Sequence, residues 1–251
     1  MFSTILGLVI GFSGILLGNM LEGGHLGSLL QGTAALIVFG GTCGAVILSN
    51  RVEDLKLALD YLKVLMSNED FKARERIAQE TIQASQLARR DSILSLEPSL
   101  AKFSDPFMRT VYRFVIDGAD PEVLRRIFEE EIMINEKRKL AAAKVWADAG
   151  GYAPTIGIIG AVLGLISVMS NISDTSALGH GIAVAFVATI YGVGSANLIF
   201  LPLASKFKAL IRFRADTEQM ILEGAVSISS GMNPYLIEQK MRAFTHRVKA
   251  S

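Results

Sequence analysis

The sequence predicts an all-α polytopic membrane protein with four transmembrane helices and a helical cytoplasmic domain. All 25 lysines and arginines of the 251-residue chain lie within residues 51–144 and 206–249. Four long apolar runs lie outside these stretches, which reconciles a hydrophobic content of 51% with a charged fraction of 20%. No strand alternation or hairpin pattern stands out. Segregated charge of this kind is typical of a protein whose cationic loops stay in the cytoplasm.

Each apolar run is long enough for a helix to cross a hydrocarbon core of about 30 Å. We place the spans at 3–21, 30–48, 153–172 and 182–204. The first run has no positively charged residue before it and no convincing cleavage site before Glu22. We therefore expect a retained first span and not a signal peptide.

The distribution of lysine and arginine also predicts the sidedness of the chain. The short links 22–29 and 173–181 contain neither residue, so we expect both links outside and both termini in the cytoplasm. The predicted domains are transmembrane helices 1 and 2 (1–48), a cytoplasmic helical domain (49–152), transmembrane helices 3 and 4 (153–204) and a cytoplasmic C-terminal tail (205–251).

The cytoplasmic segment has the spacing of amphipathic helices, with apolar residues recurring every three or four positions from Arg51 to Leu87. Asp120-Pro121 is a helix start, with Asp as the cap and Pro in the first turn, and we expect this helix to run towards Trp146. Turns are expected at 68–70 and 97–106. Further helices are expected up to about Ser229 and from Pro234.

Two spans carry small residues on one helix face, where a second helix can approach closely. The pattern does not distinguish packing within one subunit from packing between subunits. The residues are Gly7, Gly11, Gly14 and Gly18 in the first span, and Gly157, Gly160, Ala161 and Gly164 in the third.

The spans contain no Asp, Glu, His, Lys or Arg. A pump or transporter usually carries an ionisable group near the middle of the bilayer, so a titrating group must come from another chain if this protein handles ions. Neutral hydroxyls such as those of Thr155, Thr189 and Tyr191 can line a hydrated path, although they do not titrate near neutral pH. Pro154 and Pro202, at the cytoplasmic ends of spans 3 and 4, mark either a span boundary or a kink.

Several functional classes find no support in the sequence. Basic residues are mixed with acidic ones and form no aromatic-basic stripe, which argues against a nucleic-acid partner. No Walker loop, metal-ligand spacing or nucleophile–base pair is present, so we expect no metal, no cofactor and no enzyme activity. The lone Cys43 is expected to be a small packing residue. A stand-alone transporter, the rival from another class, also lacks the in-membrane charge that it would need.

Two segments resemble a known family. Residues 154–165 read PTIGIIGAVLGL and are similar to the third span of MotA/PomA subunits of the bacterial flagellar stator. Residues 185–192 read AFVATIYG and are similar to the start of the fourth span. The order of two spans, a large loop, two spans and a charged tail also matches, so the resemblance covers essentially the whole chain.

The resemblance implies a rotary machine in the bacterial cytoplasmic membrane. Members of this family form a ring of five, embedded in membrane lipid, around two copies of a single-span partner, MotB or PomB. That partner supplies a membrane aspartate as ion carrier and a periplasmic domain that binds peptidoglycan. Ion flow turns the ring, whose cytoplasmic part pushes the rotor protein FliG.

The resemblance also assigns roles to charged residues in the cytoplasmic segment. Residues 89–97 read RRDSILSLE, in which Arg89 and Glu97 match the charges that face FliG, with Arg90 as an alternative carrier of the same role. Exposed charges suit such a contact because they steer transient docking without holding the partners together.

Coupling and ion choice follow from the same resemblance. Pro154 and Pro202 match two prolines that couple ion flow to cytoplasmic movement, and Thr189, followed by Tyr191, matches a threonine of the ion path. Sodium-driven members have threonines where this chain has Ala161 and Ala188. A desolvated sodium ion needs several oxygen ligands, so two methyl groups at these positions predict a proton-driven stator.

The nearest rival is a TolQ/ExbB-type energiser of outer-membrane processes. Such proteins usually have three spans, with the large cytoplasmic part after the first. The four predicted spans, with the large part after the second, favour the stator.

Overall fold

The computed structural model describes residues 2–66, 71–170 and 175–246. Every element of this described part is a helix, as the sequence predicted. The elements are, in chain order, α1 (Phe2–Leu21), η1 (Leu26–Leu29), α2 (Gly32–Ala35), η2 (Leu36–Gly40), α3 (Gly41–Ser49), α4 (Val52–Met66), α5 (Phe71–Arg90), η3 (Ile93–Lys102), α6 (Pro106–Ile116), α7 (Pro121–Ser170), α8 (Thr175–Ser195), η4 (Ala196–Phe200), α9 (Leu201–Ser229) and α10 (Pro234–His246).

Within the described residues, four helical stretches are long and apolar enough to cross a membrane. They are Thr4–Leu21 and Leu26–Ser49, and apolar windows inside Pro121–Ser170 and Leu178–Ser229. These stretches match the four predicted spans, apart from residues 171 and 172 of the third, which lie outside the described part of the chain. The predicted fold class is therefore confirmed.

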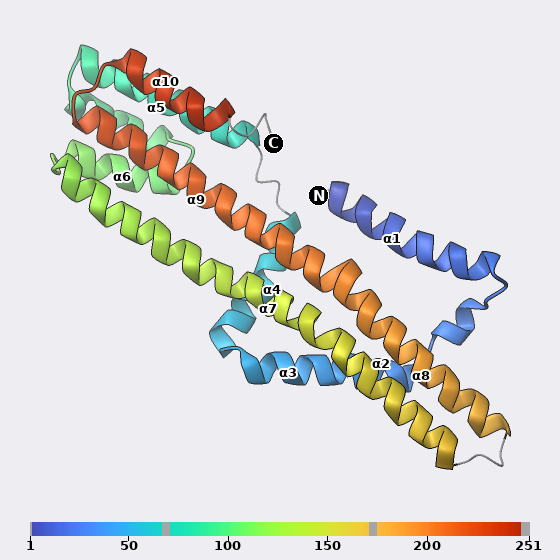
Figure 1. Cartoon of the computed structure of the whole chain (residues 1–251). Coiled ribbons are helices and arrows are strands. Elements are labelled where there is room, and N and C mark those ends of the chain that lie inside the picture. The colour runs from blue at the N-terminus through green and yellow to red at the C-terminus, as the bar shows by residue number, and fades with distance from the viewer. Residues whose placement is uncertain (1, 67–70, 171–174, 247–251) are drawn as a thin grey trace. The chain divides into compact units, whose positions relative to one another are not determined.

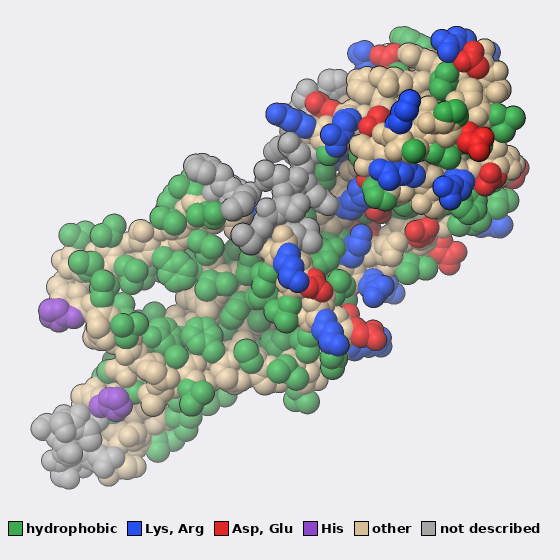
Figure 2. All heavy atoms as spheres, turned by 180° about the vertical axis from the view of Figure 1, so that it is seen from behind, with side chains coloured by type: hydrophobic (Ala, Val, Ile, Leu, Met, Phe, Trp, Pro, Cys, Tyr) green, Lys and Arg blue, Asp and Glu red, His purple; other side chains and the backbone are tan. Residues whose placement is uncertain are grey.

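The chain divides into two compact units. The first unit comprises Met1–Asn68 and Lys139–Lys208, and the second comprises Glu69–Arg138 and Ala209–Ser251. Helices α7 and α9 contribute residues to both units (Figure 1). The predicted domain borders concern the membrane surface and stay a prediction. On the face seen in Figure 2, hydrophobic side chains cover the spans, while Lys, Arg, Asp and Glu side chains cover the second unit.

The second unit has a core built by α5, η3, α6 and parts of α7, α9 and α10. Tyr112, Phe128 and Phe103 are buried there, and Tyr112 meets Phe103 edge-on at 5.0 Å between ring centroids. The predicted start of α7 is confirmed, because Asp120 Oδ1 accepts hydrogen bonds from the amides of Glu122 and Val123 at 2.9 and 3.2 Å.

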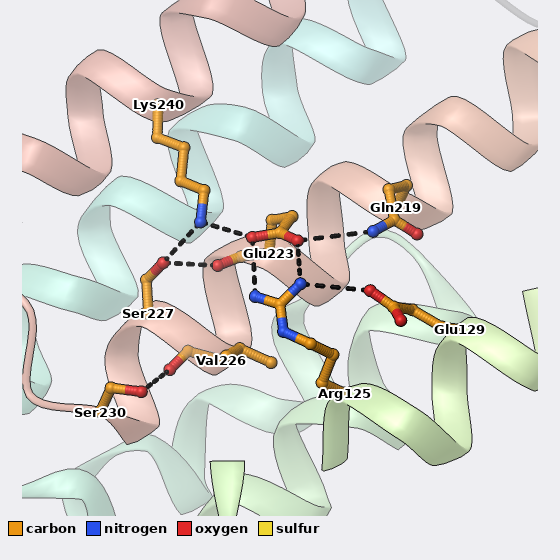
Figure 3. A network of polar contacts seen from close by, with 8 residues as sticks. All are labelled: Arg125, Glu129, Gln219, Glu223, Val226, Ser227, Ser230 and Lys240. Atoms are coloured by element: carbon orange, nitrogen blue, oxygen red, sulfur yellow. Dashed lines mark hydrogen bonds and ion pairs between the residues drawn. The ribbon is translucent and has the colours of Figure 1, made fainter. Parts of the chain in front are cut away.

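Partly buried ion pairs hold the helices of this unit together. Glu223 on α9 pairs with Arg125 on α7 and with Lys240 on α10 (Figure 3). Arg125 also reaches Glu129 at 3.2 Å. Because α10 packs on α5, the pairing of Lys240 with Glu223 also helps to hold α5 in place. The hydrogen bonds from Arg125 and Lys240 lower the pKa of Glu223 to about 2.

A second ion pair fixes the start of α6. Asp105 caps this helix, accepting from the amide of Phe107 at 2.8 Å, and its carboxylate also binds Arg214 of α9. Burial alone would raise the pKa of Asp105, but the hydrogen bonds from Arg214 hold it below its ordinary value.

Helices α7 and α8 of the first unit touch along a line of small residues. A Cβ atom built on Gly157 would lie 2.9 Å from the carbonyl oxygen of Ala188, and one on Gly192 would lie 2.5 Å from that of Ala153. The glycines of the third span therefore pack against α8 of the same chain. In the first span a Cβ on Gly7, Gly14 or Gly18 would meet nothing within 4 Å.

We predict that Gly192→Val destabilises the first unit, because backbone atoms that cannot move away surround the new side chain. Overpacking of this kind costs about 1–3 kcal/mol. Thermal unfolding of the purified protein in detergent measures the effect. Gly194→Val is the matched control on the same helix, since a Cβ there meets nothing within 4 Å. Equal melting temperatures for the two variants would contradict the close contact.

We also predict that Glu223→Gln lowers the free energy of unfolding of the second unit by about 1–3 kcal/mol at neutral pH, because it removes a carboxylate that binds two cations. Because folding lowers the pKa of Glu223, the stabilisation is present above about pH 4.5 and is lost as the pH falls towards 2. Amide hydrogen exchange of α9 and α10 as a function of pH measures it.

The matched control is Glu238→Gln, which breaks the surface pair of Glu238 with Arg242 and should cost less than about 1 kcal/mol. If Glu223→Gln leaves the pH dependence of exchange unchanged between pH 4.5 and 2, the network does not stabilise the unit.

Candidate functional site

The three predicted rotor-facing residues all lie in the second unit. Arg89 and Arg90 end α5, where positive charge is favourable beside the C-terminal carbonyl groups, and Glu97 lies within η3. All three side chains are exposed. Leu96 is fully buried in the core, so η3 presents Glu97 from an anchored position, next to Leu94, which is 65% exposed.

The two arginines differ in their surroundings. The guanidinium of Arg90 donates two hydrogen bonds to the carboxylate of Asp91, at 3.0 and 2.8 Å. These bonds hold the pKa of Asp91 below its ordinary value. Neither Arg89 nor Glu97 forms an ion pair with another described residue. Arg89 and Glu97 therefore carry the uncompensated charges of this surface.

The ion-path candidates lie in the first unit, on α7, α8 and α9. Pro154 is inside α7, which continues as a helix on both sides of it. Thr155 is exposed, and its hydroxyl donates to the carbonyl oxygen of Tyr152 at 2.8 Å. The hydroxyl of Thr155 is therefore satisfied by its own helix.

Pro202 is the second residue of α9, which directly follows η4, a turn of π-helix. A proline has no amide hydrogen, and its ring collides with the carbonyl group four residues earlier, here that of Leu198. The widened π-helical turn at 196–200 contains Leu198, the residue whose carbonyl group the proline ring would meet. The two prolines thus lie within helical stretches, and neither ends its helix.

The two predicted selectivity positions have different environments. Ala188 is fully buried, and a Cβ built on Gly160 would lie 2.7 Å from its methyl group. Ala161, the next residue along α7, is half-buried. The contact of α7 with α8 therefore brings Ala188 beside the residue that precedes Ala161.

Tyr191 makes a contact that the sequence did not reveal. Its hydroxyl donates to the carbonyl oxygen of Leu29 at 2.6 Å and accepts from the amide of Gln31 at 3.3 Å. Its ring also stacks on Phe39 at 5.9 Å between centroids. These bonds join the fourth span to the start of the second. No sequence pattern marks partners about 160 residues apart, so this link was missed.

Thr189 is half-buried, and its hydroxyl donates to the carbonyl oxygen of Ala185 at 3.2 Å.

The exposed Thr155 shares one face of α7 with Ile159, Val162 and Ile166, at helical spacings of four, three and four. Half or more of each of these three aliphatic residues is exposed in the single chain. This face is available to a membrane, another copy or a partner span.

Comparison with known proteins places the chain in a family. A profile of the MotA/TolQ/ExbB proton channel family matches residues 99–220, and a profile of the Motility protein A N-terminal region matches residues 5–84. Motility protein A of Bacillus subtilis (strain 168) is 32% identical over 239 residues, covering 95% of this chain and 88% of that protein.

Two solved structures are similar over nearly the whole chain. The structure of C. jejuni MotAB has a TM-score of 0.90 and 31% identity, and covers 96% of this chain and 94% of that one. The flagellar MotAB stator complex from Bacillus subtilis has a TM-score of 0.88 and 32% identity, covering 96% and 95%. The chain therefore belongs to the MotA/TolQ/ExbB proton channel family, and within it to the motility protein A group.

Proposed function

We propose that this chain forms the ring of a proton-driven flagellar stator that turns against the rotor protein FliG. Its family membership makes it a stator ion-channel subunit of the inner membrane, and the similar MotAB structures support a MotB partner. The ring of five, the docking on FliG and the proton as coupling ion go beyond the comparisons and are part of the proposal. We expect no enzyme activity from a subunit of this kind.

One observation carries the mechanism: the four predicted spans contain no Asp, Glu, His, Lys or Arg. The hydroxyl groups of Thr155, Thr189 and Tyr191 are bonded within the chain. A carboxylate that binds and releases the proton must therefore come from the partner span. This chain would supply the walls of the path and the movement, with Pro154 and Pro202 as the residues that transmit it.

The close packing of α7 on α8 supports the proton as the coupling ion. Sodium needs several oxygen ligands at short distance, whereas a proton is carried on a single carboxylate. At Ala188 there is a methyl group enclosed by the backbone of α7, and at Ala161 a second methyl group. Neither side chain offers an oxygen atom to an ion.

The sidedness of the chain is inferred from its charges. With the loop 49–150 and both termini in the cytoplasm, the exposed Arg89 and Glu97 are on the side of the membrane where a rotor can meet them. The motility relatives and four candidate spans support the stator over an energiser of outer-membrane processes.

We predict that Arg89→Glu will roughly halve swimming speed, or abolish swimming, in cells that depend on this chain, because reversed charge repels the rotor surface that Arg89 meets. Cells lacking the gene, complemented with each variant, are tracked while their filaments are counted by electron microscopy. Arg90→Gln is the matched control, with a smaller effect, because Asp91 already balances the charge of Arg90.

Two results would go against this proposal. Normal swimming of cells with Arg89→Glu would show that Arg89 is not part of the rotor contact. Normal swimming after deletion of the gene, when the cell has no other stator, would remove the stator function itself.

We predict that cells powered by this stator alone keep swimming when sodium is replaced by potassium, and stop when a protonophore dissipates the proton gradient. The reason is that neither Ala161 nor Ala188 provides a sodium ligand. Swimming speed is measured in both media at constant ionic strength. Swimming that survives the protonophore and stops without sodium would reverse the assignment.

A further inference from the structure

A groove opens in the first unit between α1 and the end of the last span. Its volume is about 370 Å³, and its walls come from α1, η4 and α9. The residues that the argument uses are Thr4, Gly7, Leu198, Pro202 and Lys206. Most of the wall is aliphatic, and no carboxylate lines it.

Among the described residues that line the groove, Lys206 is the charged one. Its ammonium group donates to the hydroxyl of Thr4, and it forms no ion pair with a carboxylate of the described residues. The side chain is half-buried. A cation that is partly withdrawn from water and has no counter-ion is unfavourable, so this end of the groove suits an anion.

The groove is polar at one end and apolar along its length. From Leu198 to Lys206 the helix rises about 12 Å. Thr4 and Lys206 both lie at the ends of spans that the charge distribution places at the cytoplasmic surface. This polarity matches an amphipathic ligand with an anionic head at Lys206 and a hydrocarbon chain directed into the membrane.

Gly7 keeps the groove open. A Cβ built on Gly7 would meet no atom within 4 Å, so the missing side chain leaves space and does not serve a close helix contact. A larger side chain at this position would occupy the groove without displacing a neighbour. This property gives a direct way to block the groove.

We propose that this groove binds one anionic phospholipid of the cytoplasmic leaflet, with its phosphate on Lys206 and an acyl chain along Gly7 and Leu198. Cationic pockets beside cytoplasmic helix ends are favourable sites for anionic headgroups. The site rests on the proposed sidedness of the chain. The bound lipid packs against η4 and Pro202, so the lipid composition of the membrane affects the one widened turn of the last span.

The test counts lipids on the stator complex, purified with its partner subunit. The complex is incubated with phosphatidylglycerol or with phosphatidylcholine of the same chain length, and native mass spectrometry counts the molecules retained. We expect retention of phosphatidylglycerol over phosphatidylcholine. Lys206→Gln should weaken phosphatidylglycerol binding about fivefold, the effect of one cation near a membrane surface. Gly7→Leu should abolish it.

Two matched controls should retain the lipid. Lys208→Gln removes an exposed cation two residues away, which points to a different side of the helix. Gly14→Leu adds the same side chain to α1 at a glycine that also has no neighbour within 4 Å but does not line the groove.

The proposal fails if phosphatidylcholine is retained equally or if neither variant changes the lipid count. The lipid count does not depend on rotation. Failure of the lipid proposal therefore does not contradict the stator function, which the swimming experiments test separately.

Discussion

The backbone contact between α7 and α8 is the constraint on which the membrane part of the chain depends. Gly157 and Gly192 allow carbonyl groups of one helix to touch the other, and no side chain lies between them. In a lipid bilayer, apolar side chains gain little free energy by moving from lipid to protein. Close van der Waals packing therefore supplies the attraction between the two helices. It also fixes the rotation of α7, so that Thr155 and the aliphatic residues on its face point away from α8. The face offered to a partner is thus set by the glycines opposite it.

The two units use different kinds of interaction. In the first, the spans are uncharged. The hydroxyls of Thr155 and Thr189 bond within their own helix, and that of Tyr191 bonds to a neighbouring segment. In the second, Glu223 and Asp105 each join distant helices through charge. Rigid ion pairs suit the force-transmitting role that we propose for this unit. Neutral spans suit a part that must leave the titrating step to another chain.

Sequence patterns predicted what depends on local chemistry. The number of spans, the cap at Asp120 and the helices after Pro234 follow from hydropathy, capping and proline placement, and the structure has them. Contacts between residues far apart in the chain produce no local sequence pattern from which they could be predicted. The pairing of Arg125 with Glu223 joins residues 98 positions apart, and Glu223 reads in the sequence as an ordinary surface acid. The glycines of span 3 predicted a close helix contact, but they did not identify the helix that makes it. The roles of Pro154, Thr189 and Glu97 rest on family resemblance, because an exposed charge or a satisfied hydroxyl looks the same with or without a function.

The second unit is discontinuous in sequence, since residues 69–138 precede the third and fourth spans and residues 209–251 follow them. Leu124 and Phe128 are synthesised before those spans, whereas Met220, Ile237 and Met241, which complete the same core, emerge after them. This core therefore cannot close until both spans have left the ribosome. A chain whose later spans fail to insert keeps half a core exposed to water, where proteases can recognise it. Completion of this core thus depends on synthesis of both later spans.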